Sequence, residues 1–465
     1  MHNLLQSLGG TIFLFLLVCS FSQCSVEEPD YNIEPLYADA TAFDNEIAVR
    51  WNSVMNELER YTTGYKSPVA ARSMAYINVA AYEAIVQGMT GKYNSIASRP
   101  LRLPVPQISK NEAYFWPLVL NSCYKYAIQS FYPTAPSEQQ LIIIQTYEEL
   151  SLKYSQNISP ATAQRSIEFG RQVAETFYTW SKEDQAGDAA YLRISDPSYT
   201  PPAGEGLWQA TIPDYAPAVL PYWGTVRPFI AEQQDFAIDP PVAYSTDPGS
   251  RFYKEAKYTH DQALKIRENP SDEGLWIAQF WSDDFSPLTF TPAGRWTAIA
   301  SQMITAENVN LADAVMLYAK LSMGLSDAAV GCWQNKFKYN VLRPVDYIRH
   351  TMDPDWNTMM KPELVDEYYS PATPSYPSEH ATYGAVATTI LAAYFGDQYR
   401  LTDRCHEGRI EFRSDPRSFL NLKDMADENA YSRMQIGVCY TFDADAGLRL
   451  GHQVAFSVNK IQFKK

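Results

Sequence analysis

The chain has 465 residues, of which 46% are hydrophobic and 14% aromatic, so it can bury a large core and is not intrinsically disordered. Its 53 acidic residues outnumber its 38 basic residues, which gives a formal net charge of −15. This charge argues against a nucleic-acid-binding or anionic-lipid-binding surface, because both partners are polyanions. An anionic ligand must therefore be held by a local group of basic side chains.

The N-terminal residues predict an exported protein. The first 23 residues contain no Lys, Arg, Asp or Glu, and the apolar run TIFLFLLVC has signal-peptide length and is too short to span a membrane. Cys24, in the stretch FSQCSVEEPD, is a candidate lipidation site because this stretch resembles the signals of bacterial outer-membrane lipoproteins. We expect a signal peptide over 1–24 and a lipoprotein in the periplasm or at the outer membrane or cell surface. The alternative is cleavage nearby and a soluble periplasmic protein.

Residues 25–45 are acidic and show little periodicity, so we expect a solvated tether. Beyond them, apolar residues recur at the helical period. Ser67 is the expected N-cap of one helix, with Pro68 at its first position. Similar patterns predict further helices over residues 114–131, 138–153, 160–181, 295–303 and 311–340. Few strands are expected, since alternating runs joined by Asn-Gly or Asp-Gly turns are scarce.

One stretch departs from the helical pattern. Residues 185–250 are dense in Pro, Gly, Tyr and Trp, and such a segment is expected to wrap a helical core or to line a site. The sequence thus predicts an all-α protein, a helical bundle with long irregular connections. We divide it into an N-terminal helical region, 46–300, which contains the irregular insert, and a C-terminal region, 301–465, which carries the chemistry.

The cysteines outside the leader do not predict a disulfide framework or a zinc site. Their spacing is wide and includes no CxxC pair. The residues concerned are Cys123, Cys332, Cys405 and Cys439. For the first three, the expected default is an isolated buried thiol.

Three short blocks in the last third of the chain concentrate basic and titratable residues. The first is WQNKFKYNVLRP, residues 333–344. On one helix, Lys336 and Arg343 would lie within about 20° of the same face, together with Trp333. Pro344 is expected to end this helix and to leave the Arg343 guanidinium near the C-terminal end of the helix.

The second and third blocks add a helix start and a second guanidinium. In YPSEHATYGAVATTILAAYF, residues 376–395, Ser378 marks a helix start that directs backbone N–H groups, its hydroxyl and His380 toward one point, where the helix dipole favours an anion. In SRMQIGVCYTFDADAG, Arg433 supplies the guanidinium. Asp443 is expected to share a helix face with Cys439, one turn earlier.

Together these blocks predict a site for a tetrahedral oxyanion such as phosphate or vanadate. Guanidinium groups bind its oxygens bidentately, and a lysine adds a compact charge. Taken singly, each residue has an ordinary explanation as a solvated charge, a helix cap, a structural histidine or a core thiol. We define the predicted oxyanion site as Lys336, Arg343, Arg433, Ser378 and His380.

The three blocks, in this order, resemble the signature of the vanadium-dependent haloperoxidase and type 2 phosphatidic acid phosphatase superfamily, K-x6-R-P, then P-S-G-H, then S-R-x5-H-x3-D. Glu379 replaces the Gly of the second motif, and Cys439 replaces the His of the third. The stretches SPVAARSMAYINVAAYEA, LPYWGTVRPF and FTPAGRW also resemble soluble bacterial haloperoxidase-like proteins. The resemblance covers the chain from about residue 45 to its C-terminus.

The resemblance implies an all-α bundle fold and a role for each motif residue. Lys336, Arg343 and Arg433 would hold the oxyanion, which is vanadate in the peroxidases. Ser378 and the backbone N–H of Glu379 would complete its shell.

Four further positions carry implied roles. His380 would act as general acid and base. Residue 439 would be the axial vanadate ligand in a peroxidase or the nucleophile in a phosphatase, oriented by Asp443. Trp333 matches an aromatic residue of chloroperoxidases and is a candidate halide-site residue.

Cys439 and Glu379 depart from the family pattern. A thiol is a softer ligand than imidazole and needs deprotonation, although three nearby cations could lower its pKa. The Glu379 carboxylate must point away from an anion, because like charges in a dry pocket repel. His350 and His452 are the alternative histidines that could fill the position.

Three functions remain open from the sequence. The first is an exported haloperoxidase that uses vanadate and peroxide to oxidise halide. The second is a phosphomonoester hydrolase with Cys439 or water as nucleophile. The third is a lipoprotein that binds an oxyanion without catalysis, because Cys439 replaces the family His. No nucleic-acid partner is expected.

Overall fold

The computed structural model describes residues 38–89, 91–109, 111–269, 273–283, 285–360, 368–410 and 412–465. The predicted signal peptide, Cys24 and most of the predicted tether lie outside the described residues. The helices are α1 Glu46–Tyr61, α2 Ser67–Ile85, α3 Trp116–Phe131, α4 Ser137–Ser155, α5 Pro160–Ser181, α6 Arg251–Glu268, α7 Glu273–Phe280, α8 Pro292–Ala306, α9 Leu311–Tyr339, α10 Pro344–Thr351, α11 Glu379–Phe395, α12 Leu422–Gln435 and α13 Thr441–Asn459. The strands are β1 Leu401–Asp403 and β2 Arg417–Phe419, which pair antiparallel.

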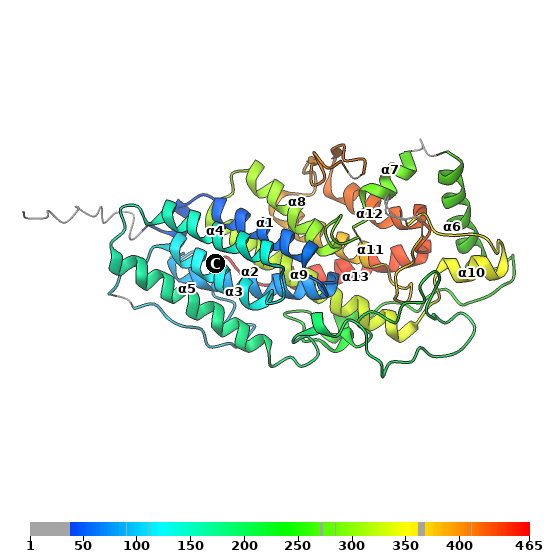
Figure 1. Ribbon diagram of the computed structural model, residues 1–465, viewed down its shortest axis with the longest axis horizontal. Coiled ribbons are helices and arrows are strands. Elements are labelled where there is room, and N and C mark those ends of the chain that lie inside the picture. Colours follow the sequence, from blue (N-terminus) through cyan, green and yellow to red (C-terminus); the bar gives the residue numbers. More distant parts are fainter. Residues whose placement is uncertain are drawn as a thin grey trace, which may run out of the picture.

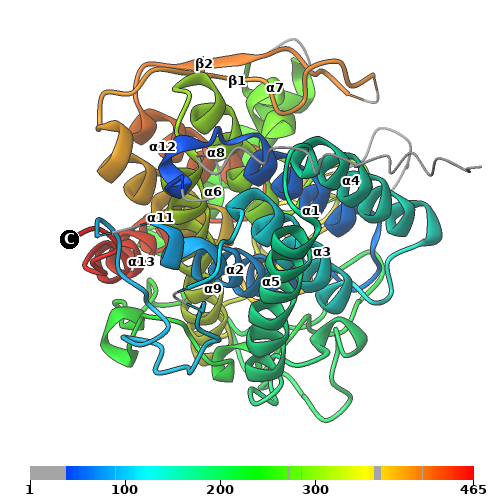
Figure 2. The ribbon, with the colours of Figure 1, turned by 90° about the vertical axis from the view of Figure 1, so that its left-hand side faces the viewer.

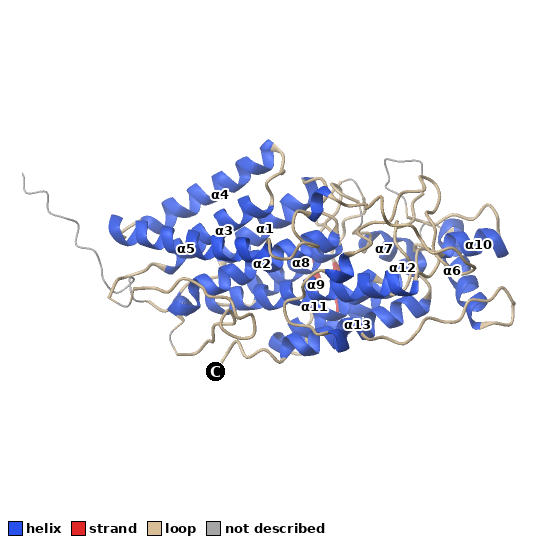
Figure 3. Cartoon of the chain, turned by 90° about the horizontal axis from the view of Figure 1, so that it is seen from below, coloured by secondary structure: helices blue, strands red, loops and turns tan. Residues whose placement is uncertain are grey.

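The helices form two neighbouring groups joined by α9. Figure 1 shows α1–α5 at one end of the elongated molecule and α11–α13 in its other half. Helix α9 packs against α2 in the first group and against α11 and α13 in the second. Figure 2, viewed from that end, places the β1–β2 hairpin at the edge of the molecule, and Figure 3 shows how little strand there is among the helices. The predicted all-α bundle is confirmed.

Helix α9 is the central element because almost every one of its side chains is buried. Its sequence carries apolar and small residues all round instead of one apolar stripe, as a core helix requires. Asn310 caps its start, and its side-chain oxygen accepts a hydrogen bond from Asp313 N at 3.1 Å. Gly324 leaves room for α11, since a Cβ there would lie 2.5 Å from Ile390. The end of this rigid helix carries Lys336.

Helices α11 and α13 pack closely because two glycines of α13 face α11. A Cβ at Gly447 would lie 2.5 Å from Ser378 O, and a Cβ at Gly451 would lie 2.3 Å from Thr382 O. Both distances are shorter than ordinary van der Waals contact, so only glycine permits this approach. The start of α11 is thereby held against α13.

The irregular stretch 185–250 forms short 3-10 turns and otherwise lacks regular structure. Part of it is tied to α9 by a buried carboxylate. Asp327 accepts from the N–H groups of three consecutive residues, at 2.6 Å from Phe229, 2.8 Å from Ile230 and 2.8 Å from Ala231. The division of the chain into the regions 46–300 and 301–465 stays a prediction.

Local helix predictions were accurate where apolar periodicity is strong. The pattern over 160–181 matches α5, and that over 311–340 matches α9 within one residue. The expected N-cap Ser67 is instead the first residue of α2, and Lys66, with extended backbone, is the cap. No described helix is long and apolar enough to cross a membrane.

Replacement of Gly451 by alanine should destabilise the protein by about 1–3 kcal/mol, because the added methyl group must push α11 away from α13. This loss is expected although alanine is the better helix former. Urea denaturation measures the free energy of unfolding. Gly249→Ala is the matched control, since the nearest atom to its added Cβ is at 3.5 Å, an ordinary contact. Equal stability of the two variants would contradict the close packing of α11 and α13.

Candidate active site

Lys336 and Arg343 do not lie on one helix, which corrects the prediction for 333–344. Helix α9 ends at Tyr339, and Asn340 follows in the left-handed conformation with φ 49° and ψ 44°. Arg343 is the N-cap of α10, whose first residue is Pro344. The chain therefore turns between the two basic residues. Both are nevertheless buried, with exposed fractions of 1% for Lys336 and 3% for Arg343.

Both cations donate to the loop that precedes α11. Lys336 Nζ donates to Pro374 O at 2.8 Å and to Ser375 O at 3.1 Å. Arg343 Nε donates to Thr373 O at 2.7 Å, and its Nη2 donates to Thr373 Oγ1 at 2.8 Å. Arg343 Nη1 also donates to Val438 O at 2.9 Å. The loop is thus held in place by two buried charges.

The predicted helix start at Ser378 is confirmed. Ser378 is the N-cap of α11, and its Oγ accepts from Ala381 N at 3.4 Å. Ser378 N donates to Asp443 O at 2.9 Å, which joins this helix start to α13. His380 lies in the first turn of α11 and is buried. The positive end of the α11 dipole therefore lies at the loop that Lys336 and Arg343 hold.

Cys439 and Asp443 do not share a helix face, because Cys439 lies in the turn before α13. Asp443 is in the first turn of α13, where its Oδ2 accepts from Tyr440 N at 2.9 Å and from Ser375 Oγ at 2.5 Å. Burial raises the pKa of Asp443 to about 6. This carboxyl group therefore caps α13 and fixes the loop before α11.

The three predicted cations converge on Cys439. Its Sγ lies 3.8 Å from Arg343 Nη1, and the charges of Arg343, Lys336 and Arg433 all act on its ionisation. Arg433, on α12, is buried and donates through Nη1 to Trp281 O at 3.4 Å. The three basic residues come from separate elements; Arg343 contacts the sulfur atom, and the charges of Lys336 and Arg433 act on it from nearby.

The ionisation of Cys439 differs from the sequence expectation. Burial and the charge of Asp443 raise the pKa of the Cys439 thiol, and the three cations only partly oppose them. Burial also lowers the pKa of Lys336. The site therefore presents a neutral thiol, whereas the sequence allowed for a thiolate.

A cavity of about 160 Å³ lies beside this site. We call it the inner cavity. Trp333, Thr373 and Glu379 line it from the side of the predicted motifs, and Glu59 and Asp283 line it from other elements. Trp333 Nε1 donates to Val219 O at 3.1 Å, so the irregular stretch fixes this indole. The charge of Glu379 also acts on Lys336, so this carboxyl group is close to the site.

Glu59 is a buried carboxyl group that sequence reasoning missed. Thr291 N donates to its Oε1 at 3.0 Å, and Thr291 Oγ1 donates to its Oε2 at 2.7 Å. Burial raises the pKa of Glu59 to about 8. Gly294 is needed beside it, since a Cβ there would lie 1.7 Å from Glu59 Oε1. Three residues of the motif FTPAGRW thus shape this region. Thr291 donates to Glu59, Gly294 leaves space for the carboxyl group, and Arg295, the next residue, is a buried arginine.

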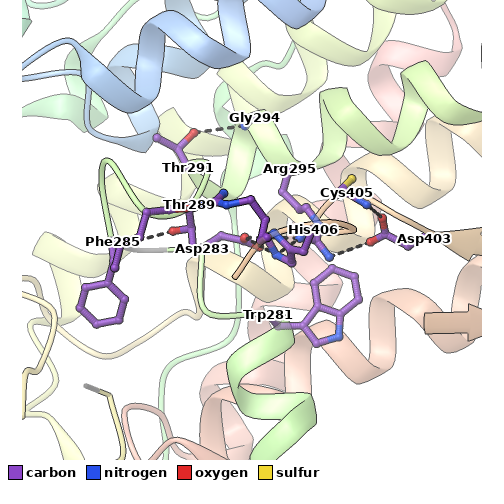
Figure 4. A network of polar contacts seen from close by, with 12 residues as sticks. Trp281, Asp283, Phe285, Thr289, Thr291, Gly294, Arg295, Asp403, Cys405 and His406 are labelled. Carbon is purple, nitrogen blue, oxygen red and sulfur yellow. Dashed lines mark hydrogen bonds and ion pairs between the residues drawn. The ribbon is translucent and has the colours of Figure 1, made fainter. Parts of the chain in front are cut away.

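Figure 4 shows that arginine, Arg295, in a network with Asp403, Asp283 and His406. Arg295 Nη2 lies 2.7 Å from Asp403 Oδ2, its Nη1 lies 3.7 Å from Asp283 Oδ1, and Nη1 also contacts His406 Nε2. Burial, aided by the charge of Arg295, lowers the pKa of His406, so its neutral ring accepts from the guanidinium. Trp281 stacks on Arg295, and its main-chain oxygen accepts from Arg433, which links this Arg295 network to the predicted oxyanion site.

The other predicted histidines do not fill the position of Cys439. His350 and His452 are both exposed, whereas Cys439 is buried. His452 pairs through Nδ1 with Thr389 Oγ1 at 2.8 Å. Among the described residues, no group of His, Cys, Asp and Glu side chains could hold a metal ion by itself.

With rising pH, the free energy of unfolding should decrease less in Glu59→Gln than in the wild-type protein. The pKa of Glu59 is raised from 4.5 to about 8 in the native state, so the native state binds more protons than the unfolded state between these values. Stability is therefore lost as the pH rises toward 8, by up to about 1.4 kcal/mol per pH unit from this group. Urea denaturation at several pH values measures the slope. Glu57→Gln, a change on the same helix, should keep the wild-type slope, and an unchanged slope in Glu59→Gln would show that Glu59 is ionised throughout.

Comparisons with known proteins agree on one family. The family model of the second helical-bundle domain of vanadium chloroperoxidase matches residues 316–464. A vanadium chloroperoxidase of Curvularia inaequalis is 26% identical over 203 residues, which are 38% of this chain and 32% of that protein. The match thus spans about a third of the length of this curated relative.

Solved structures extend the likeness to most of the chain. The first bacterial vanadium-dependent iodoperoxidase is 28% identical, with a TM-score of 0.79, over 91% of this chain and 98% of its own. A holo-type bacterial vanadium-dependent chloroperoxidase is 13% identical, with a TM-score of 0.65, over 90% of this chain and 97% of its own, and shows a shared fold. By its motif blocks, its fold and these relatives, the chain is similar to the vanadium-dependent haloperoxidases, and its residues 316–464 match their second helical-bundle domain.

Proposed function

We propose that this protein binds vanadate and oxidises a halide ion with hydrogen peroxide. The observation that carries the proposal is the convergence of Lys336, Arg343 and Arg433 around Cys439 in a buried site at the start of α11. The likeness to an iodoperoxidase over most of the chain supports it and makes iodide the first halide to test.

The charged and polar groups fit the oxygens of a tetrahedral oxyanion. Lys336, Arg343 and Arg433 supply positive charge, which a buried dianion needs because it loses its hydration. Ser378 and the N–H of Glu379, at the α11 N-terminus, supply short-range donors. These groups would hold vanadate by charge and hydrogen bonds.

The side chain at position 439 does not fit vanadate as well. Cys439 offers a protonated thiol, whereas vanadium(V) is bound well by an imidazole nitrogen. Asp443 already accepts from Ser375 and Tyr440, so it holds the protein scaffold beside that position. We therefore propose that the oxyanion is retained by its oxygens alone.

The residues around the inner cavity perform the remaining steps. When bound, vanadate supplies a Lewis-acidic centre that activates hydrogen peroxide toward halide. His380, buried in the first turn of α11, takes up and returns the peroxide proton. Trp333 and Thr373 form the wall where the halide binds, and their apolar surface weakens its hydration.

A phosphatase reaction with Cys439 as nucleophile is less well supported. Such a reaction needs a thiolate, and burial raises the pKa of this thiol. If the protein binds vanadate or phosphate but turns over neither iodide nor a phosphoester, the third alternative, an oxyanion-binding protein without catalysis, is supported. We also propose export, with lipidation at Cys24, on the N-terminal sequence alone.

Cys439→His should increase turnover about tenfold or more, because it adds the nitrogen donor that the position lacks. Triiodide formation from iodide and peroxide, with added orthovanadate, measures the rate. The wild-type protein should also turn over, and Cys439→Ser should stay near the wild-type rate. Turnover in Cys439→His with none in the wild type would reject the peroxidase function for the natural protein.

Arg343→Gln should weaken orthovanadate binding by about 10- to 100-fold, because it removes a charge-assisted donor from a buried site. Titration calorimetry measures the affinity, and circular dichroism checks the fold. Arg449→Gln removes the same charge from an exposed position of α13 and should leave the affinity unchanged. If both variants bind alike, the anion binds elsewhere.

A further inference from the structure

A groove of about 790 Å³ lies next to the inner cavity. We call it the outer groove. It is formed by α1 on one side, α8 on the other, and the segment 399–405, which contains β1.

The outer groove and the inner cavity share a wall. Arg60 and Phe290 line both of them, and the Arg60 guanidinium carbon lies 5.8 Å from the centre of the Phe290 ring. The inner cavity in turn reaches Trp333 and Thr373 beside the oxyanion site. A molecule in the outer groove is therefore separated from the inner cavity by one pair of side chains.

The outer groove is basic although the protein is acidic. Arg60, Arg400 and Arg404 line it against the single carboxylate of Glu57, in a chain with a formal net charge of −15. Arg60 donates to Glu57 and to Pro287 O, and Arg404 to Glu407. Arg400 is exposed and has no hydrogen bond or ion pair with any residue that the structure describes. Its guanidinium can therefore bind a carboxylate bidentately.

The rest of the groove is largely apolar. Phe290, Ala298 and Leu401 provide apolar walls. Asn56 lies one helical turn before Arg60 on α1, close to the shared wall, but its side-chain oxygen is itself buried and offers no contact to a ligand. The groove therefore suits a ring that carries one anionic group.

We propose that the outer groove binds a phenolic carboxylate, such as a hydroxybenzoate, as the organic acceptor of the oxidised halide. Arg400 binds the carboxylate, the apolar walls hold the ring, and the phenolic hydroxyl group activates the ring carbons toward electrophilic halogenation. The acceptor role rests on the proposed peroxidase function, whereas the binding does not. In the transfer, hypohalous acid gives its halogen to a ring carbon, and the displaced ring proton leaves with the hydroxide as water.

The test is titration calorimetry of the full chain with 4-hydroxybenzoate, in the absence of peroxide, halide and vanadate. We expect saturable binding that Arg400→Gln weakens about tenfold, since it removes a charge-assisted bidentate contact. Ala298→Phe, which fills the groove from α8, should abolish it. Arg449→Gln is the matched control and should bind like the wild type. The neutral 4-hydroxybenzamide should bind about tenfold more weakly than the acid.

Each contrary result overturns the proposal. These results are no saturable binding, equal affinity in Arg400→Gln and wild type, full binding in a folded Ala298→Phe, or equal affinity for the amide and the acid. The triiodide assay, which needs no organic acceptor, separates this proposal from the peroxidase function. If triiodide forms but hydroxybenzoate does not bind, only the proposal for the outer groove is rejected. If hydroxybenzoate binds but no triiodide forms, only the proposed peroxidase function is rejected.

Discussion

The structure depends on the burial of three positive charges in one small region. A buried ammonium or guanidinium group loses its hydration and must find other partners. Lys336 and Arg343 find them in main-chain oxygens of the loop 373–375, and Arg433 in Trp281 O. These contacts require that the end of α9, the start of α11 and the turn before α13 lie together. The close packing of α11 on α13 and the Asp443 contacts to Ser375 and Tyr440 serve that requirement.

Much of the site could be predicted because its residues fall in short, ordered blocks. Lys336, Arg343 and Arg433 do meet, and Ser378 does begin a helix. What the sequence could not supply is the path of the chain between the blocks. The left-handed Asn340 ends α9 before Arg343, whereas the sequence placed Lys336 and Arg343 on one helix that ends at Pro344. The burial that keeps Cys439 protonated is likewise a tertiary effect, which local charge counting underestimates.

The helices likewise differ in how well the sequence predicts them. Helices α5 and α9 follow from apolar periodicity, whereas the largely polar α6 and the eight-residue α10 do not stand out from their neighbours. Glu59 and Arg295 were missed because their partners are distant in sequence. Asp403 lies 108 residues after Arg295, and Thr291 lies 232 residues after Glu59. Charged residues of this kind look like surface residues until the fold brings their partners to them.

The use of main-chain acceptors by Lys336 has an evolutionary consequence. A carbonyl oxygen is present whatever side chain its residue carries, so positions 374 and 375 can be substituted without removing the acceptors that hold the ammonium group. The preceding residues of the same loop, Pro371, Ala372 and Thr373, line the inner cavity. The anchoring of the buried ammonium group therefore does not depend on the identity of the side chains at positions 374 and 375.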